Sequence, residues 1–399
     1  MTNRTASLAD RYKELLATAP APVTVLTGPC GSGRTEILLQ LRSLLGPASC
    51  QYINIERIAT TPERFLSALV SDSPFQGPLP DASQSHAPRE AFDAGLAFLS
   101  SACTRDGRPA TFLLDEVLDL RTFESFPGLR SAMPDLVGAL ESSPNRFVFA
   151  TRFTHRATRM VDASSNRLAL VALPLMTATE IREVLAGQLN GLGSGMAEDL
   201  ARSVHALTDG RPAYVADIVA VLGNMGVSAA DPVGAFVSLL ASPSTLWGRC
   251  RFSYELRLHR ARGYGALKAI LDVLAEEEPL SLTAIAQRMH RTPGSTKDYL
   301  GWLEDVDLIC ADRKRYRISD PVLRLWIRLN GRSVPATEDL VAREVQRYAM
   351  LRLAAAARVE ATQTTQVSPV PDTVPALVGS AQPADPLLRV RSSGIVEFD

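Results

Sequence analysis

The sequence predicts an α/β fold in which a five-stranded parallel sheet is covered by helices on both faces. Five short apolar runs alternate with stretches of helical periodicity, which is the pattern of buried parallel strands joined by crossover helices. Hydrophobic residues make up 46% of the 399 residues and charged residues 21%, so the chain has enough apolar material for buried cores. This composition excludes a chain that is disordered or fibrous throughout. The five expected strands are residues 23–27, 51–55, 111–115, 147–151 and 168–172.

Net charge and cysteine usage exclude several other classes of protein. The formal net charge is −1, so binding to nucleic acid or to an anionic membrane would require a local basic patch. The five cysteines form no CxxC pair and, with five histidines, give no zinc-ligand spacing, which indicates reduced thiols of a cytoplasmic protein. The chain has no apolar run of about 18 residues and no secretion-signal pattern, so we expect neither a membrane span nor export.

Periodicity and turn residues predict the elements around and beyond the sheet. Residues 7–18 have helical spacing behind a serine cap, and residues 71–88 are rich in Pro, Ser and Gly, as in a surface loop. Beyond the last strand, Thr177 and Glu180 form a capping-box pattern at the start of a helix. Two further helices are expected at residues 196–208 and 212–225.

A third region combines three short helices with a hairpin. Three segments repeat apolar residues at i, i+3, i+4 and i+7, and each gives one buried helix face. These segments begin at Leu267, Leu282 and Tyr299, and the sequence LICADRKRYRIS then predicts a small hairpin at residues 308–319. A long helix is expected at residues 338–359.

The end of the chain has a different composition. Residues 361–386 are rich in Pro, Ser, Thr and Gln, which predicts a disordered linker. Residues 387–399, LLRVRSSGIVEFD, are apolar enough to predict a docking peptide for a protein partner.

A glycine-rich loop joins the first expected strand to a helix. The residues GPCGSGRTE follow that strand directly and match the pattern G-x-x-x-x-G-[K/R]-T. Glycines let successive backbone N–H groups point at phosphate oxygens, and the helix adds its positive dipole end. Thr35 offers a hydroxyl to Mg²⁺, whereas Arg34 stands where lysine is expected and keeps the charge in a bulkier planar group. The expected nucleotide-binding residues are Gly28, Pro29, Cys30, Gly31, Ser32, Gly33, Arg34 and Thr35.

Two carboxylates follow the third expected strand. The segment TFLLDE, residues 111–116, reads as a buried strand that ends in Asp115 and Glu116. Combined with the glycine-rich loop, Asp115 is expected to hold Mg²⁺ through water and Glu116 to polarise the water that attacks a γ-phosphate. The next strand, RFVFAT, ends in Thr151, whose polar side chain is expected to sense the γ-phosphate. The expected cofactors are therefore ATP and Mg²⁺.

With these motifs, residues 7–330 resemble the AAA+/STAND group of P-loop ATPases, especially the archaeal-type ATPases and the related origin-recognition ATPases. The resemblance implies a five-stranded core, a helical lid and a winged-helix domain in that order. It also implies that Arg167, before the last core strand, is an arginine finger, and that Gly210, Arg211 and Pro212 in TDGRP form the sensor 2 motif of the lid. The implied domains are a core at 1–173, a lid at 174–245, a winged helix at 246–330, a helix at 331–360 and a disordered linker with terminal peptide at 361–399.

The expected winged-helix domain is more basic than the rest of the chain. Residues 251–330 hold 14 Lys/Arg against 11 Asp/Glu, and Lys297 lies at the start of the third helix, where a helix-turn-helix presents groups to DNA. The residues expected to contact double-stranded DNA are Lys297, Arg313, Lys314, Arg315 and Arg317. Many winged helices bind proteins instead, so a protein partner is the alternative.

The sequence therefore predicts a nucleotide-dependent switch that binds ATP and hydrolyses it slowly, with ATP between core and lid. Its expected catalytic residues are Glu116, Thr151, Arg167 and Arg211, with Arg167 acting on a neighbouring copy in a homo-oligomer. One alternative is a regulator that binds nucleotide without hydrolysing it. Another is a transcription regulator or protein-interaction scaffold with a degenerate P-loop.

Overall fold

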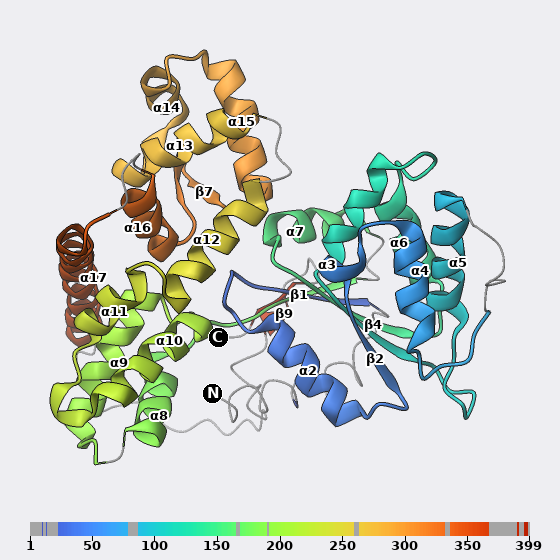
Figure 1. Cartoon of the computed structure of the whole chain (residues 1–399), viewed down its shortest axis with the longest axis horizontal. Helices are drawn as coiled ribbons and strands as arrows, with labels where there is room; N and C mark the ends of the chain where they lie inside the picture. Colours follow the sequence, from blue (N-terminus) through green and yellow to red (C-terminus); the bar gives the residue numbers. More distant parts are fainter. Residues whose placement is uncertain are drawn as a thin grey trace, which may run out of the picture. The chain divides into compact units, whose positions relative to one another are not determined.

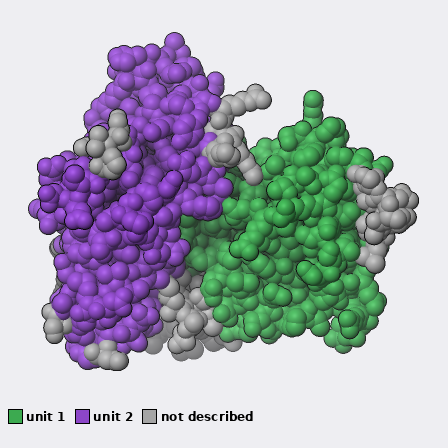
Figure 2. All heavy atoms as spheres, viewed as in Figure 1, with its two compact units in different colours: residues 1–174, 387–399 green, residues 175–386 purple. Residues whose placement is uncertain are grey.

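A parallel sheet of five strands, extended by two short strands from the end of the chain, forms the centre of the first of two units (Figures 1 and 2). In this computed structural model, unit 1 comprises residues 1–174 and 387–399, and unit 2 comprises residues 175–386. The structure describes residues 10, 13, 23–78, 87–164, 168–189, 191–258, 263–331, 336–366, 389–390 and 395–397. Most of the expected helix at 7–18 and of the expected linker at 361–386 lies outside these residues.

The five strands predicted from the apolar runs are all present and parallel. They are β1 (Val23–Thr27), β2 (Cys50–Asn54), β3 (Thr111–Asp115), β4 (Arg146–Thr151) and β5 (Leu168–Ala172). Three of them have the predicted bounds; β2 begins and ends one residue earlier than expected, because Ile55 starts a short helix capped by Asn54. The sheet order is β2-β3-β4-β1-β5-β10-β9, in which β10 (Ile395–Glu397) runs parallel to β5 and β9 (Arg389–Val390) antiparallel to β10.

Strand order and register bring the predicted site residues to one edge of the sheet. β4 lies between β1 and β3, and Thr27, at the end of β1, is in register with Thr151 at the end of β4. Asp115, at the end of β3, is in register with Ala150 on β4. The carboxyl ends of parallel strands meet at one edge, so the loop after β1, Thr151 and the two carboxylates lie side by side.

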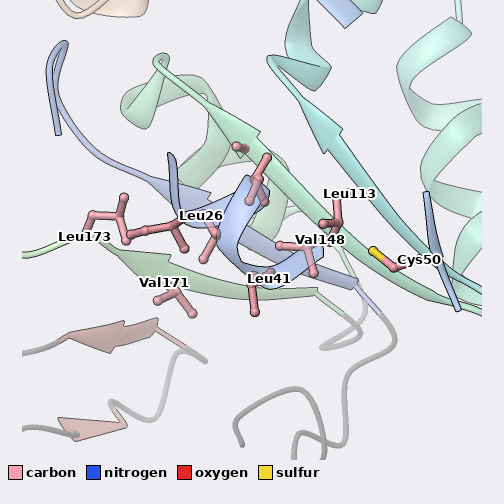
Figure 3. Close-up of a cluster of buried hydrophobic side chains, with 10 residues drawn as sticks. Leu26, Leu41, Cys50, Leu113, Val148, Val171 and Leu173 are labelled. Atoms are coloured by element: carbon pink, nitrogen blue, oxygen red, sulfur yellow. The ribbon is translucent and has the colours of Figure 1, made fainter. Parts of the chain in front are cut away.

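Helix α2 (Arg34–Leu45) packs its apolar stripe on the sheet and so fixes the loop that precedes it. Ile37, Leu38 and Leu41 of this helix are buried. Figure 3 shows this cluster, in which they meet Leu26, Cys50, Leu113, Val148, Ala150, Val171 and Leu173. Side chains alternate along a strand, so the residues next to these face the opposite side. There Phe112 and Phe147 stack with ring centroids 5.6 Å apart.

The rest of unit 1 is helical. Helix α4 packs on α5, and α5 packs on α6. These elements are α3 (Ile55–Ile58), α4 (Pro62–Ser71), α5 (Pro88–Ser101), the 3₁₀ helix η1 (Val117–Ser125), α6 (Ala132–Glu141) and α7 (Thr154–Asp162).

Unit 2 begins as a group of helices, and its first helix carries the predicted cap. The Thr177 hydroxyl accepts a hydrogen bond from the Glu180 amide, and the Glu180 carboxylate accepts one from the Thr177 amide. The helices of this part are α8 (Ala178–Gln188), α9 (Ser194–Thr208), α10 (Pro212–Met225), α11 (Pro232–Leu240) and α12 (Thr245–Leu258), with the short 3₁₀ helix η2 (Val227–Ala229).

Three further helices and a three-stranded antiparallel sheet of order β6-β8-β7 follow. The elements are α13 (Tyr264–Glu276), β6 (Leu280–Ser281), α14 (Leu282–Arg288), α15 (Pro293–Asp305), β7 (Ile309–Asp312) and β8 (Arg315–Ile318). The chain then forms α16 (Pro321–Asn330) and the long helix α17 (Glu338–Gln366). α17 begins where the sequence predicts but continues beyond residue 359, because no Pro or Gly interrupts it before Pro369. None of the helices among the described residues is long and apolar enough to cross a membrane.

Candidate nucleotide-binding site

The loop between β1 and α2 has a backbone that requires its glycines. Gly31 and Gly33 have φ of 81° and 89°, in the left-handed region that side chains with a Cβ rarely adopt. A Cβ on Gly28 would lie 2.6 Å from Oγ of Ser32 and would crowd the turn. The loop therefore curls tightly ahead of the amino terminus of α2, where backbone N–H groups and the helix dipole favour an anion.

Thr35 and Asp115 form the pair of groups that the sequence predicts for a metal ion. The Thr35 hydroxyl donates a hydrogen bond of 2.7 Å to Oδ2 of Asp115, and the Tyr52 hydroxyl donates another of 3.0 Å to the same oxygen. Oδ1 of Asp115 is buried and has no hydrogen-bond partner among the described residues. Burial raises the pKa of Asp115, although the Thr35 hydrogen bond opposes this. A buried carboxylate oxygen without a partner is costly, and a cation would satisfy it.

The donor set at Asp115 fits a hard cation that keeps water and phosphate ligands. No group of three or more His, Cys, Asp or Glu side chains that could hold a metal occurs in the described parts of the chain. The described residues therefore do not supply a full set of metal ligands. One carboxylate and one hydroxyl are the few protein ligands with which proteins hold Mg²⁺ beside phosphates.

Glu116 lies between two arginines. Its Oε1 is 3.0 Å from Nη2 of Arg34, and its Oε2 is 3.0 Å from Nε of Arg152 and accepts the backbone N–H of Arg152 at 3.0 Å. Burial alone would raise the pKa of Glu116, but the two guanidinium charges and the Arg152 hydrogen bonds outweigh it and hold that pKa below its usual value. Glu116 also has a φ of 55°, an uncommon left-handed conformation for a residue with a side chain. The carboxylate is therefore ionised and held in place from both sides.

Arg34 turns back onto the loop that carries it. Its Nη1 donates to the backbone carbonyls of Gly28 and Pro29, the latter at 2.8 Å, while its Nη2 pairs with Glu116. A lysine could not make these contacts together, because its ammonium is a single point rather than a planar fork. In this arrangement the charge of Arg34 is directed to Glu116 and to the loop backbone.

Arg152, directly after Thr151, is a site residue that the sequence reasoning missed. Its guanidinium is 3.0 Å from a carboxylate oxygen of Glu56 and 3.4 Å from one of Asp119, in addition to its contact with Glu116. These three carboxylates raise its pKa against the opposing effect of burial. A charged residue immediately after a buried strand, as in RFVFATR, was the available signal. Thr151 itself is fully buried, and its hydroxyl oxygen accepts the backbone N–H of Phe153 at 3.2 Å.

The other predicted catalytic residues lie elsewhere. Arg167 is outside the described residues. Arg211 belongs to unit 2, where it is 5% exposed and its guanidinium lies 3.5 Å from a carboxylate oxygen of Asp320. Gly210 has a φ of 67°, and a Cβ there would lie 2.1 Å from the carbonyl oxygen of Met176, so this position requires glycine. Pro212 begins α10.

The predicted DNA-contacting residues are all exposed and belong to unit 2. Lys297 lies near the start of α15, and the turn between β7 and β8 consists of Arg313 and Lys314. These two residues have φ of 48° and 64°. Arg315 and Arg317 follow on β8. The structure thus gathers four of the five cations on one hairpin.

Comparison with known proteins identifies the fold. No protein-family model and no curated protein matches the chain. Among solved structures, a Walker-type ATPase of Pyrococcus abyssi matches with a TM-score of 0.56 and 18% identity, over 80% of this chain and 94% of its own. A STAND ATPase of Pyrococcus horikoshii with a tetratricopeptide repeat sensor matches with a TM-score of 0.31 and 14% identity, over 87% of this chain and 47% of its own. A mutant RuvB of Thermotoga maritima matches with a TM-score of 0.37 and 13% identity, over 83% and 95%. Because the first of these similarities covers most of both chains, and because a glycine-rich loop joins β1 to α2, the chain has the fold of a P-loop ATPase.

Proposed function

We propose that the chain binds ATP with Mg²⁺ at residues 28–35 and acts as a nucleotide-dependent switch that hydrolyses ATP slowly. This proposal rests on Oδ1 of Asp115, which is buried without a hydrogen-bond partner among the described residues. The other oxygen of the same carboxylate accepts a hydrogen bond from the Thr35 hydroxyl, directly after the glycine-rich loop. Thr35 and Asp115 would hold the metal ion, which supplies positive charge against the β- and γ-phosphates. The loop backbone would hold the phosphate oxygens.

The contacts of Glu116 support slow hydrolysis. As the base, Glu116 orients the attacking water and Thr151 lies on the neighbouring strand end to sense the γ-phosphate. Glu116 must present an oxygen to that water, yet both of its oxygens pair with Arg34 or Arg152. Turnover then requires one of these ion pairs to open. The same contacts favour a second candidate function, a regulator that binds ATP without hydrolysing it.

Calorimetry and phosphate release test this function. Wild-type protein should bind ATP in a Mg²⁺-dependent manner, and Asp115→Asn should lose most of that dependence. Asp217→Asn, a change of a carboxylate in unit 2, is the matched control. No ATP binding by the wild type would refute the proposal, whereas binding without Mg²⁺-dependent phosphate release would favour the regulator.

Removing the Tyr52 hydroxyl should weaken the metal site specifically. Burial and the nearby Asp115 charge raise the pKa of Tyr52 to about 12, so the hydroxyl remains a donor at any physiological pH. Tyr52→Phe deletes one of two hydrogen bonds to Oδ2 of Asp115, worth about 0.5–1.5 kcal/mol. We expect the Mg²⁺ concentration for half-maximal ATP binding to rise about twofold to tenfold, with metal-free binding unchanged. Tyr316→Phe on β8 is the control, and equal shifts in both variants would contradict a role at the metal site.

The roles proposed for Arg211 and Arg167 in catalysis rest on their positions in the sequence. The pairing of Arg211 with Asp320, and of its Nη2 with the Ser319 carbonyl at 3.3 Å, supports a structural role at the start of α16. A role toward nucleotide would require these contacts to open. For Arg167, the proposed finger acts on a neighbouring copy, so mixing Arg167→Ala with a Glu116→Gln chain should restore turnover to part of the mixed assemblies.

We propose DNA binding by unit 2 as a separable activity. The order α13–β6–α14–α15–β7–β8 with its three-stranded sheet supports a winged helix, and the β7–β8 turn supplies the specific observation. A two-residue turn with both φ values positive favours Asn and Gly, because such residues avoid strain. Here Arg313 and Lys314 occupy it. Two long cations at strained backbone positions support a role for their charge in contact with an anion.

Salt dependence tests the DNA contact. Each phosphate contact contributes a slope of about −0.9 to log K against log salt. Arg313→Ala with Arg315→Ala should therefore weaken duplex binding for unrelated sequences and flatten the slope by about two units. Lys297→Ala should instead alter preference among sequences if the side chain reaches base edges. Arg121→Ala in unit 1 is the control, and no duplex binding by the wild type at low salt would assign unit 2 to a protein partner.

A further inference from the structure

Strand β2 forms one edge of the sheet of unit 1 (Figure 1). Its inner side pairs with β3, where the Thr111 N–H donates to the Ser49 carbonyl at 3.1 Å and Cys50 is in register with Thr111. Backbone groups alternate in direction along a strand, so those of Gln51 face β3, whereas the N–H and C=O groups of Cys50 and Tyr52 face away from it. No described strand pairs with this outer side. The outer side of β2 can therefore accept another strand.

A cavity of about 470 Å³ lies against β2, and all five residues of the strand line it. Side chains of consecutive strand residues point to opposite faces, so a space that touches all five lies along the edge of the strand. The inner edge is occupied by β3, which leaves the outer edge. Arg42 at the end of α2, Arg57 on α3 and residues 72–74 after α4 supply the other walls of this cavity, the β2 groove. Its volume is within the range of about 300–1,000 Å³ that is typical of ligand sites.

Hydrogen bonds hold one wall of the β2 groove in place. The Ser73 hydroxyl donates to Oε1 of Gln51 at 2.8 Å, and Nε2 of Gln51 donates to the Leu69 carbonyl at 2.9 Å. The amide of Gln51 thus joins β2 to the end of α4 through both of its polar atoms. A ligand meets a wall that is already formed, so binding does not carry the entropy cost of ordering it.

Two arginines without a partner among the described residues give the β2 groove its charge. Arg42 and Arg57 are exposed, and neither guanidinium forms an ion pair or a hydrogen bond with another described residue. Burial raises the pKa of the Cys50 thiol to about 12 and the charge of Arg42 opposes this, so Arg42 lies near the start of β2. The Arg57 N–H donates to Oδ1 of Asn54 at 3.2 Å, at the end of the strand. Asp72 is the one carboxylate among the described residues that line the groove, which therefore carries a positive charge toward each end of β2.

We propose that the β2 groove binds an extended acidic peptide of a partner protein by strand addition. Backbone hydrogen bonds to Cys50 and Tyr52 supply affinity for an extended chain, and carboxylates of the ligand that meet Arg42 and Arg57 supply selectivity. From its first to its last residue β2 spans about 13 Å at about 3.3 Å per residue, so the recognised segment has about five residues with an acidic side chain at each end. Side chains four positions apart lie on the same face of an extended chain, and an acid at each end fits either direction of the added strand.

Fluorescence anisotropy with a labelled synthetic peptide tests the charge of the groove. The probe is Asp-Val-Thr-Val-Asp flanked by Gly-Ser on each side, in which Val and Thr favour an extended chain. The full-length protein without nucleotide should bind it saturably, and about threefold or more tighter than the peptide with asparagine at both aspartate positions. The assay contains no ATP, so its failure is distinguishable from a failure of ATP binding.

Reversing the charges of the groove gives the sharper comparison. Arg42→Glu with Arg57→Glu should weaken binding of the probe about tenfold or more, because like charges then oppose each other. The same variant should bind the peptide with lysine in place of both aspartates more tightly than the wild type does. Arg105→Glu with Arg130→Glu, which changes two exposed arginines of unit 1 outside the groove, is the matched control. Equal effects of the two double variants would overturn the proposal.

Hydrogen exchange tests strand addition itself. Saturating probe should slow exchange over residues 50–54 about fivefold or more, since the outer N–H groups of β2 become paired. The peptide with Pro-Pro in place of its central Val-Thr lacks a donor on each side and should neither bind nor slow exchange. Unchanged exchange under saturating probe would overturn the proposal. No binding of the probe would overturn it too and leave the arginines as charges that protect an edge strand from pairing. Slower exchange at higher protein concentration without peptide would also overturn it, because a second copy would then occupy the edge.

Discussion

Replacing Glu116 with glutamine is expected to reduce ATP turnover about 100-fold or more while ATP remains bound. A positioned general base contributes on the order of 10²–10⁴-fold, and the amide cannot accept a proton from water. ATP binding should persist because the substitution leaves Thr35, Asp115 and the loop glycines in place. Single-turnover phosphate release with calorimetric affinity measures both effects. Glu124→Gln, which changes a partly exposed carboxylate of η1 that pairs with Arg121, is the matched control, and wild-type turnover in Glu116→Gln would remove Glu116 from the mechanism.

The same substitution should lower stability, because Glu116 is the shared partner of the buried Arg152 and the partly buried Arg34. Removing one member of a buried ion pair leaves an uncompensated charge and costs on the order of 3 kcal/mol, although Arg152 keeps Glu56 and Asp119. The pKa of Glu116 is lowered in the folded protein, so its stabilising contribution is complete above the ordinary glutamate value of 4.5. The difference in unfolding free energy between wild type and Glu116→Gln should therefore be constant at neutral pH and shrink as the pH falls below that value. Denaturant titrations at several pH values measure it.

Arg34→Lys is expected to raise turnover, and Arg34→Ala to weaken ATP binding by about 2 kcal/mol, or roughly 30-fold. The guanidinium of Arg34 joins the loop carbonyls to Glu116, and a lysine ammonium cannot make both contacts. With lysine, Glu116 loses one of its two restraints while the positive charge beside the phosphates remains. Steady-state phosphate release and calorimetry of the three proteins provide the comparison.

The two substitutions at Arg34 separate two roles for this residue. If Arg34→Ala binds ATP as well as the wild type does, the arginine does not contact phosphate. If Arg34→Lys is slower than the wild type, the fork geometry itself serves turnover, and the contact with Glu116 is not inhibitory. Arg42→Lys, near the other end of α2, is the control for a change of arginine to lysine on the same helix.

The strands of the sheet were predictable because each is marked by its own short stretch of sequence. Each strand is a run of five or six residues, most of them buried and with apolar residues among them, as in Thr111–Asp115, and such runs can be recognised without knowledge of their neighbours. The bounds of β2 and β4 moved by one residue, since helix capping by Asn54 ended β2 and the pairing of Arg146 with Thr111 extended β4. Thr35 and Asp115 were predictable because loop and strand motifs fix their chemistry and the strand order places them together.

The restraint of Glu116 was not predictable, because it depends on three-dimensional neighbours. Arg152 meets Glu56 from α3 and Asp119 from η1, and nothing in the local sequence pairs these residues. Tyr52 reaches Asp115 only because β2 lies next to β3. The pairing of β10 with β5 likewise follows from the fold alone, because roughly 220 residues separate the two strands.

The position of β10 has a consequence for biosynthesis. At about 5–20 residues per second, a ribosome needs on the order of 10–45 s to pass from the end of β5 to β10. Throughout that interval β5 of each nascent chain is not paired with β10, and the two strands can pair only after residues 395–397 have left the exit tunnel. Polysomes making this protein therefore carry many chains in which β5 is not yet paired with β10. We expect chains that stall or end before residue 395 to depend on chaperones more than chains that include β10.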